Sequence, residues 1–169
     1  NIQTATVNNG GIIQLLSGAS GDHITLAGSN TDLVVSGASA TNTVVNRGIV
    51  LVNASRRVNN TTVSAGFIEA SDGGVVTSTT VTGSGRVIAM GTGVVSGTVL
   101  QGVSAGLTVF QGGTAVDTTV ESGAYVLALS GTLAGTTTVE QGGSVTGYSD
   151  LTLSGTLSNA GTISNGTLV

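Results

Sequence analysis

Short runs of apolar residues alternate with polar residues along most of this chain, and glycines separate the runs. Ile49–Val52, Phe67–Ala70 and Tyr125–Leu129 are runs of this kind, rich in β-branched and aliphatic side chains. Such residues suit a pleated, half-buried surface. No run reaches the roughly 10 to 12 residues of 3.6-residue periodicity that a helix needs. The pattern therefore predicts an all-β chain built from many short strands.

One phrase in the sequence recurs after a fixed interval. Positions 118–123 read TTVESG, and positions 137–142 read TTVEQG. A Thr followed by an apolar anchor residue continues this repeat along the chain at nearly the same interval. The anchors are Val7, Leu26, Val44, Val63, Val81, Val99, Val120 and Val139. A period of roughly 20 residues is typical of a solenoid.

Each repeat reads as a strand, a glycine turn, a second strand and a glycine or serine turn. Two short strands cannot bury an apolar face alone, but parallel stacking of successive repeats buries one continuous core. Parallel crossover connections are nearly always right-handed. The sequence thus predicts a right-handed parallel β-helix of about nine rungs of roughly 19 residues, which forms a single domain over residues 1–169.

The regularity of the repeat differs along the chain. Residues 1–40 carry a looser version, residues 41–147 hold the regular rungs, and residues 148–169 are expected to form irregular terminal rungs. The step from Val99 to Val120 is the longest between anchors, which predicts two or three extra residues near positions 102–106. The chain starts and stops within the pattern, so we expect it to be a fragment of a longer rod.

Composition supports a packed core and excludes several classes of function. The chain contains 28 Gly, no Pro and no Cys, and 39% of its residues are hydrophobic, so it has an aliphatic core but no disulfide or thiolate metal site. Its net charge of −4 argues against nucleic acid and anionic membranes as partners. No apolar run reaches the roughly 18 residues of a transmembrane helix, so we expect no lipid insertion by this segment.

The charged residues do not suggest a catalytic centre. The eight acids are scattered, the chain has no Lys, and His23 is the only histidine. Enzymes with a β-helix fold that act on polysaccharides need clustered charged residues, so such an enzyme is an unlikely second alternative. Glu121 and Glu140 are expected to stack one rung apart on a solvated face, or less readily to hold a cation. We expect no catalytic site, no metal and no cofactor.

Two sets of hydroxyl residues follow the repeat. The Thr before each anchor should point outward, because neighbouring side chains alternate along a strand. These residues are Thr6, Thr25, Thr43, Thr62, Thr80, Thr98, Thr119 and Thr138. A neutral, purely structural ladder is the favoured interpretation of this rank, and ice binding is the alternative.

Serines form the second set. Ser17, Ser36 and Ser55 are evenly spaced at the interval of the repeat, which predicts a column at one corner, and Ser20 and Ser39 predict another. Further turn candidates are Ser71, Ser122 and Ser130. These serines are either ordinary turn formers or acceptors for a glycosyltransferase that reads the same corner on each rung.

Some outward positions are apolar. Because Ile49–Val52 and Tyr125–Leu129 are apolar in both alternating phases, part of each run must face outward. Together with the only basic pair, they are candidates for self-association. The candidate residues are Ile49, Leu51, Tyr125, Leu127, Leu129, Arg56 and Arg57.

The repeats resemble a known family. Positions 60–66 (NTTVSAG) and 131–143 (GTLAGTTTVEQGG) are similar to repeats of self-associating bacterial autotransporter adhesins of the AIDA, TibA and antigen 43 type. The resemblance covers nearly the whole chain. It implies a passenger rod on the outer surface of a Gram-negative bacterium, acting in autoaggregation, biofilm formation or adhesion to host cells. It further implies like chains or host surfaces as partners, and O-heptosylation of turn serines by a cytoplasmic heptosyltransferase.

Overall fold

The computed structural model describes residues 1–148, 150–164 and 167–168, which form strands and turns. Sheet A contains β1 (Ala5–Val7), β3 (Ser20–Asp22), β4 (Ile24–Leu26), β6 (Ser39–Val45), β8 (Arg57–Val63), β10 (Val75–Thr82), β12 (Val94–Gln101), β14 (Thr114–Val120), β16 (Thr132–Val139), β18 (Asp150–Asn159) and β20 (Thr167–Leu168). Sheet B contains β2 (Ile12–Leu15), β5 (Asp32–Val35), β7 (Ile49–Val52), β9 (Phe67–Ala70), β11 (Arg86–Ala89), β13 (Gly106–Phe110), β15 (Tyr125–Leu129), β17 (Ser144–Tyr148) and β19 (Thr162–Ser164).

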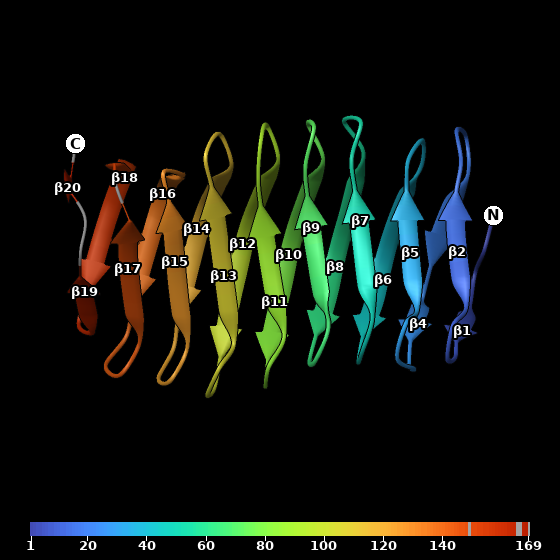
Figure 1. The fold of residues 1–169 in the computed structure, drawn as a ribbon, viewed down its shortest axis with the longest axis horizontal. Coiled ribbons are helices and arrows are strands. Elements are labelled where there is room, and N and C mark those ends of the chain that lie inside the picture. The colour runs from blue at the N-terminus through green and yellow to red at the C-terminus, as the bar shows by residue number, and fades with distance from the viewer. Residues whose placement is uncertain (149, 165–166, 169) are drawn as a thin grey trace.

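The chain alternates between the two sheets, and strands pair in parallel with the equivalent strands of the preceding and following rungs, as in β8, β10 and β12. In Figure 1 the strands of sheet B rise in front, those of sheet A descend behind, and the chain advances from right to left. This sense of winding is right-handed. The structure therefore confirms the predicted right-handed parallel β-helix. In the terminal segment 148–169, strands β18 and β19 continue the two sheets, while residues 149, 165–166 and 169 lie outside the described residues.

The core consists of aliphatic side chains that strands of both sheets contribute. Ile68 and Ala70 of β9 and Val76 and Val81 of β10 are all fully buried. The same in–out alternation recurs in the neighbouring rungs, and the buried residues form one continuous cluster along the rod. Burial of these side chains is the main favourable contribution to stability.

Sheet A bends at one position in each rung. In β8, Val58 points inward, Asn59 and Asn60 both point outward, and Thr61 points inward again. The second outward residue adopts the left-handed conformation, with φ 54° at Asn60. The equivalent residues in other rungs, all with positive φ, are His23, Asn42, Ser78, Gly97, Asp117 and Gly135. Polar residues with short side chains and glycine tolerate this conformation best, which accounts for most of this column.

Two of the predicted anchors are wrong, because the residues that point inward after the bend differ from those predicted. Register pairs Leu26 with Val45 and Val81 with Leu100, so Val45 and Leu100, not Val44 and Val99, fill the core. The inward position is set by its distance from the bend and not by the Thr–Val phrase. Thr43 and Thr98, predicted to point outward, are consequently interior residues with 1% exposure each.

The predicted insertion lies in the turn between β12 and β13. This turn spans residues 102–105, whereas the equivalent turn of the preceding rung spans 83–85. The core residues Val81, Leu100 and Val120 are register partners, and the second of these two steps is one residue longer than the first. The location was predicted correctly, but the turn contains one extra residue and not two or three.

Candidate interaction surfaces

The outer face of sheet B carries many apolar side chains, with charged and polar residues and one glycine between them. Its first outward row runs through the register partners Ile12, Asp32, Ile49, Phe67, Arg86, Gly106 and Tyr125. Its second row runs through Gln14, Val34, Leu51, Glu69, Ile88, Thr108 and Leu127. Most of the apolar members are only half-buried. The predicted candidates Ile49, Leu51, Tyr125, Leu127 and Leu129 all lie on this face, on strands β7 and β15.

The outer face of sheet A is different in character. One row contains Thr25, Val44, Thr62, Thr80, Val99 and Thr119. The expected uninterrupted threonine rank is therefore broken by Val44 and Val99. Hydroxyl and amide side chains still dominate here, as in the row of Thr41, Asn59, Thr77 and Ser96. The two faces of the rod thus differ in polarity.

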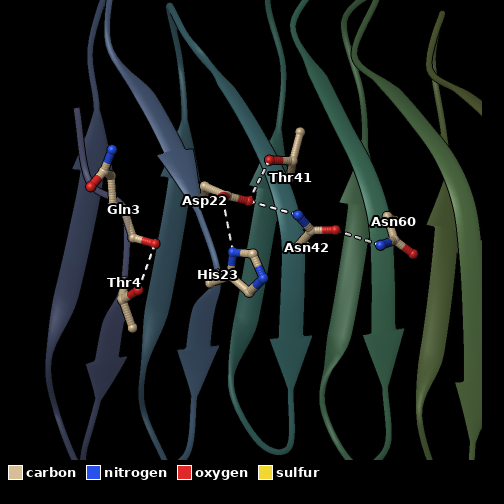
Figure 2. Close-up of polar contacts among 7 residues, drawn as sticks. All are labelled: Gln3, Thr4, Asp22, His23, Thr41, Asn42 and Asn60. Atoms are coloured by element: carbon tan, nitrogen blue, oxygen red, sulfur yellow. Dashed lines mark hydrogen bonds and ion pairs between the residues drawn. The ribbon is translucent and has the colours of Figure 1, made fainter.

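A polar ladder starts at the bend of sheet A near the N-terminal end (Figure 2). Thr41 Oγ1 and Asn42 Nδ2 donate hydrogen bonds of 2.8 and 2.7 Å to Asp22 Oδ1. His23 Nδ1 lies 2.8 Å from Asp22 Oδ2. The hydrogen bonds from Thr41, Asn42 and His23 lower the pKa of Asp22 to about 2. His23 is thus the exposed partner of Asp22.

The ladder extends to the next rungs. Asn60 Nδ2 donates to Asn42 Oδ1, and Thr77 Oγ1 donates to Asn59 Oδ1 at 2.8 Å. Farther along, the amide of Thr136 donates to Asp117 Oδ1 at 2.8 Å. These side chains satisfy one another across rungs on the solvent side of the bend, so they give the rod a polar edge. The ladder was not predicted from the sequence, although the short polar residues that recur just before the inward Thr are its signal.

Glu121 and Glu140 occupy equivalent positions in neighbouring rungs, as predicted, because Val120 and Val139 are register partners. Gln101 Nε2 donates to Glu121 Oε1 at 3.0 Å. Among the described residues, no group of three or more His, Cys, Asp or Glu side chains is arranged to hold a metal ion. The stack is a polar row at the corner between sheets A and B.

A column of threonine side chains lies inside the rod, directly after the bend. Their hydroxyls are buried and have no hydrogen-bond partner among the described residues. The residues are Thr43, Thr61, Thr79, Thr98, Thr118 and Thr137, each at most 2% exposed. A buried hydroxyl without a partner is destabilising, so this column is a weak element of the core.

The predicted serine column Ser17–Ser36–Ser55 does not form. Leu15 pairs with Val35 and Val35 with Val52, so the first step along the chain is three residues longer than the second. Ser17 therefore lies against Gly37 and not against Ser36; a Cβ at Gly37 would come within 2.4 Å of the Ser17 nitrogen. The reason is turn length at both corners, because the first step contains turns of four residues (16–19) and five residues (27–31), whereas the second contains two turns of three residues (36–38 and 46–48).

The second serine column is confirmed for one step. Ser20 and Ser39 are register partners, and the next residue in that column is Arg57. The remaining candidates are spread over two corners. Ser71 and Ser130 lie in turns that lead from sheet B to sheet A, whereas Ser122 lies in a turn at the opposite corner. Ser122 and Ser130 are exposed, and Ser71 is half-buried.

A groove of about 380 Å³ crosses three successive turns from sheet B to sheet A. We call it the turn notch; it is lined by Ser17, Gly18, Ala19, Gly37, Ala38, Ser39, Ser55, Arg56 and Arg57. The short turn 36–38 lies between two longer turns, which explains the hollow. The notch thus brings together three predicted glycosylation candidates and the two arginines that were predicted to serve self-association.

The fold is shared with a protein of known structure. No protein-family model matches the chain, and no curated protein sequence matches it. Among the described residues, no helix has the length and apolarity required to cross a membrane. A crystal structure of a hyper-glycosylated TibA fragment (residues 55–350), whose glycosylation TibC catalysed, superposes with a TM-score of 0.74. It is 24% identical, and the match covers 96% of this chain and 74% of that one. The chain therefore shares the β-solenoid fold of that TibA fragment.

Proposed function

We propose that this chain is part of an autotransporter passenger, a non-enzymatic rod on the outer surface of a Gram-negative bacterium that links cells by self-association. The observation that carries the proposal is the difference between the two faces of the rod. Sheet B presents half-buried apolar side chains to solvent over many rungs, and sheet A presents hydroxyls. Repeated apolar contacts along a rod give weak but multivalent binding, which suits autoaggregation and biofilm formation.

The favoured partner is a second copy of the chain packed face to face through sheet B. A two-fold axis parallel to the strands, between β7 and β9, places Ile49 opposite the partner's Phe67. The same axis places Asp32 opposite the partner's Arg86, since these residues lie one strand farther out on either side. Such an isologous contact combines apolar packing with two symmetric charge pairs. Adhesion to a host-cell surface is the alternative use of this face.

Sedimentation of purified rods and aggregation of cells that display them test this contact. Leu51→Asp on β7 should abolish dimers, whereas Thr80→Asp, on the outer face of sheet A, should leave them intact. Asp32→Arg and Arg86→Asp should each weaken association about tenfold, and the double exchange should restore it. Equal effects of Leu51→Asp and Thr80→Asp, or wild-type rods that stay monomeric and do not aggregate cells, would rule out the sheet B contact.

We also propose that turn serines accept sugars, with a cytoplasmic heptosyltransferase as the modifying enzyme. Two features support this: the exposure of Ser17, Ser55, Ser122 and Ser130 in turns, and the fold shared with a glycosylated TibA fragment. Intact mass of the rod purified from its own host, followed by peptide mapping of residues 17–55 and 122–130, tests the proposal. Heptose-sized additions on these serines are expected, and an unmodified mass would refute it while leaving the self-association proposal unaffected.

A further inference from the structure

The arginines are unevenly distributed along the rod. Positions 33–68 hold three of the four arginines and no Asp or Glu, so this section is positive although the chain carries a net charge of −4. Arg56 and Arg57 lie in the turn notch, at the corner where β7 leads to β8, and Arg47 lies at the opposite corner of the same rung. Within the described residues, the one contact between a basic side chain and a carboxylate is that of His23 with Asp22, and no arginine pairs with a carboxylate.

Arg56 has an unsatisfied donor. Its Nε atom is buried and has no hydrogen-bond partner among the described residues, although the side chain as a whole is only half-buried. The nearest acid along the stack is Asp72 in the next turn, whose backbone carbonyl accepts a bond of 3.3 Å from the Ser55 amide. Its carboxylate forms no ion pair with Arg56 or Arg57. Because neither Arg56 nor Arg57 pairs with a carboxylate among the described residues, both guanidinium groups are available to an external anion.

The backbone that presents these arginines is unusual. Ala54 and Ser55 both have positive φ, of 54° and 60°. In the following turn the same two positions are Asp72 and Gly73, a pair well suited to this conformation. The strained turn holds the start of β8 in place, with Arg57 in register with Ser39 at the side of the notch.

The geometry points to a binding site in the turn notch for an acidic sugar, a saccharide unit that carries a carboxylate or a sulfate. Guanidinium groups bind both anions through paired N–H donors. On the unglycosylated chain, the hydroxyls of Ser17, Ser39 and Ser55 offer donors and acceptors to sugar hydroxyls, and Gly37 and Ala38 leave room for a ring to approach. The volume falls in the range of small-molecule pockets, about 300–1,000 Å³. The notch is open to solvent and lies away from the sheet B face, so this site does not depend on self-association.

Calorimetric titration with defined oligosaccharides tests the site. The probes are a heparin-derived hexasaccharide, a hexamer of a uronic acid, and maltohexaose as the neutral control. The wild-type rod, prepared without the glycosyltransferase, is expected to bind at least one of the charged hexasaccharides and not maltohexaose. Binding of the heparin fragment alone would indicate recognition of sulfate, and binding of the uronic acid hexamer would indicate recognition of carboxylate. A poly-glutamate peptide that binds as tightly as the sugars would overturn the saccharide assignment.

Single substitutions distinguish binding in the turn notch from general attraction to positive charge. Arg56→Gln and Arg57→Gln should each weaken binding about tenfold or more. Arg47→Gln removes the same charge from the same rung outside the notch and should change affinity less than twofold. Ser39→Leu keeps every charge but fills the notch, and should abolish binding. Arg57 and Ser39 are exposed, so these two variants remain informative if Arg56→Gln does not fold. No binding of either charged sugar, or equal losses for Arg47→Gln and Arg57→Gln, would refute the site.

Discussion

The phenol ring of Tyr125 lies over the backbone of Gly106, its register partner in the preceding rung. A Cβ placed on Gly106 would come within 2.4 Å of Tyr125 Cζ and 2.5 Å of its hydroxyl oxygen. The glycine therefore provides the surface on which the ring rests, and the ring covers a strand position that has no side chain of its own. Side-chain packing of this kind between adjacent strands stabilises a sheet.

Gly106→Ala should accordingly destabilise the rod by displacing the ring. We expect a loss of about 1 kcal/mol, the lower end of the range for overpacking, because the ring can swing outward into solvent. Thermal or urea unfolding measures the loss. In a Tyr125→Ala background the same substitution should cost much less, and a cost that does not depend on Tyr125 would contradict the contact.

Val81→Asp should destabilise the rungs around β10. Val81 is fully buried between register partners Val63 and Leu100, so an aspartate there places a charge in an aliphatic core. We expect a loss of about 3 to 5 kcal/mol. Hydrogen exchange should locate the damage in β8 to β12. Thr80→Asp, one residue away on the outer face, should change stability by less than about 0.5 kcal/mol, and similar effects of the two variants would refute the register.

Thr79→Val should stabilise the rod. The Thr79 hydroxyl is buried without a partner among the described residues, and valine has the same branched shape without the polar atom. We expect a gain of about 1 kcal/mol in urea unfolding. Thr80→Val on the half-exposed neighbouring position is the matched control and should be nearly neutral. A loss of stability for Thr79→Val would mean that the hydroxyl has a partner, such as an internal water.

The stability of the folded rod should decrease at acidic pH because of Asp22. Its pKa is about 2 in the folded rod, against 3.8 for an ordinary aspartate, so the carboxylate contributes stability that is present above pH 4 and lost as the pH falls toward 2. Unfolding measured between pH 2 and pH 5 should show this loss, and Asp22→Asn should flatten part of it. An NMR titration that gives Asp22 an ordinary pKa would contradict the ladder to Thr41 and Asn42.

Much of the fold follows from the sequence because the repeat itself encodes it. Short β-branched runs and glycines that recur at a fixed interval leave few alternatives to a parallel solenoid. Inward residues such as Val63, Val81 and Val120 were assigned correctly for the same reason. The insertion near positions 102–106 was also placed correctly, since a longer step between anchors must appear as a longer turn.

The errors have two physical origins. A left-handed residue in mid-strand puts two successive side chains outside, which shifts the alternation that follows. The sequence shows this only as a short polar residue or glycine before an inward Thr, and Asn42 before Thr43 is an example. Columns at the corners were equally hard to predict, because turns of three, four and five residues change which residues meet. Ser17 and Ser36 therefore do not stack despite their spacing in the sequence, while Ser17 and Arg56 line one groove.

The variation in turn length has a consequence for how such a rod can change. In the N-terminal rungs, register steps of unequal length are accommodated at the corners, and the strands on either side keep the same inward side chains. Loss or gain of a residue in such a turn therefore leaves the inward side chains of the strands in place and reshapes mainly the surface at that corner. A rod built in this way can acquire new recognition sites one corner at a time, and the same corners are the natural places to graft a foreign peptide for display at a chosen distance along the axis.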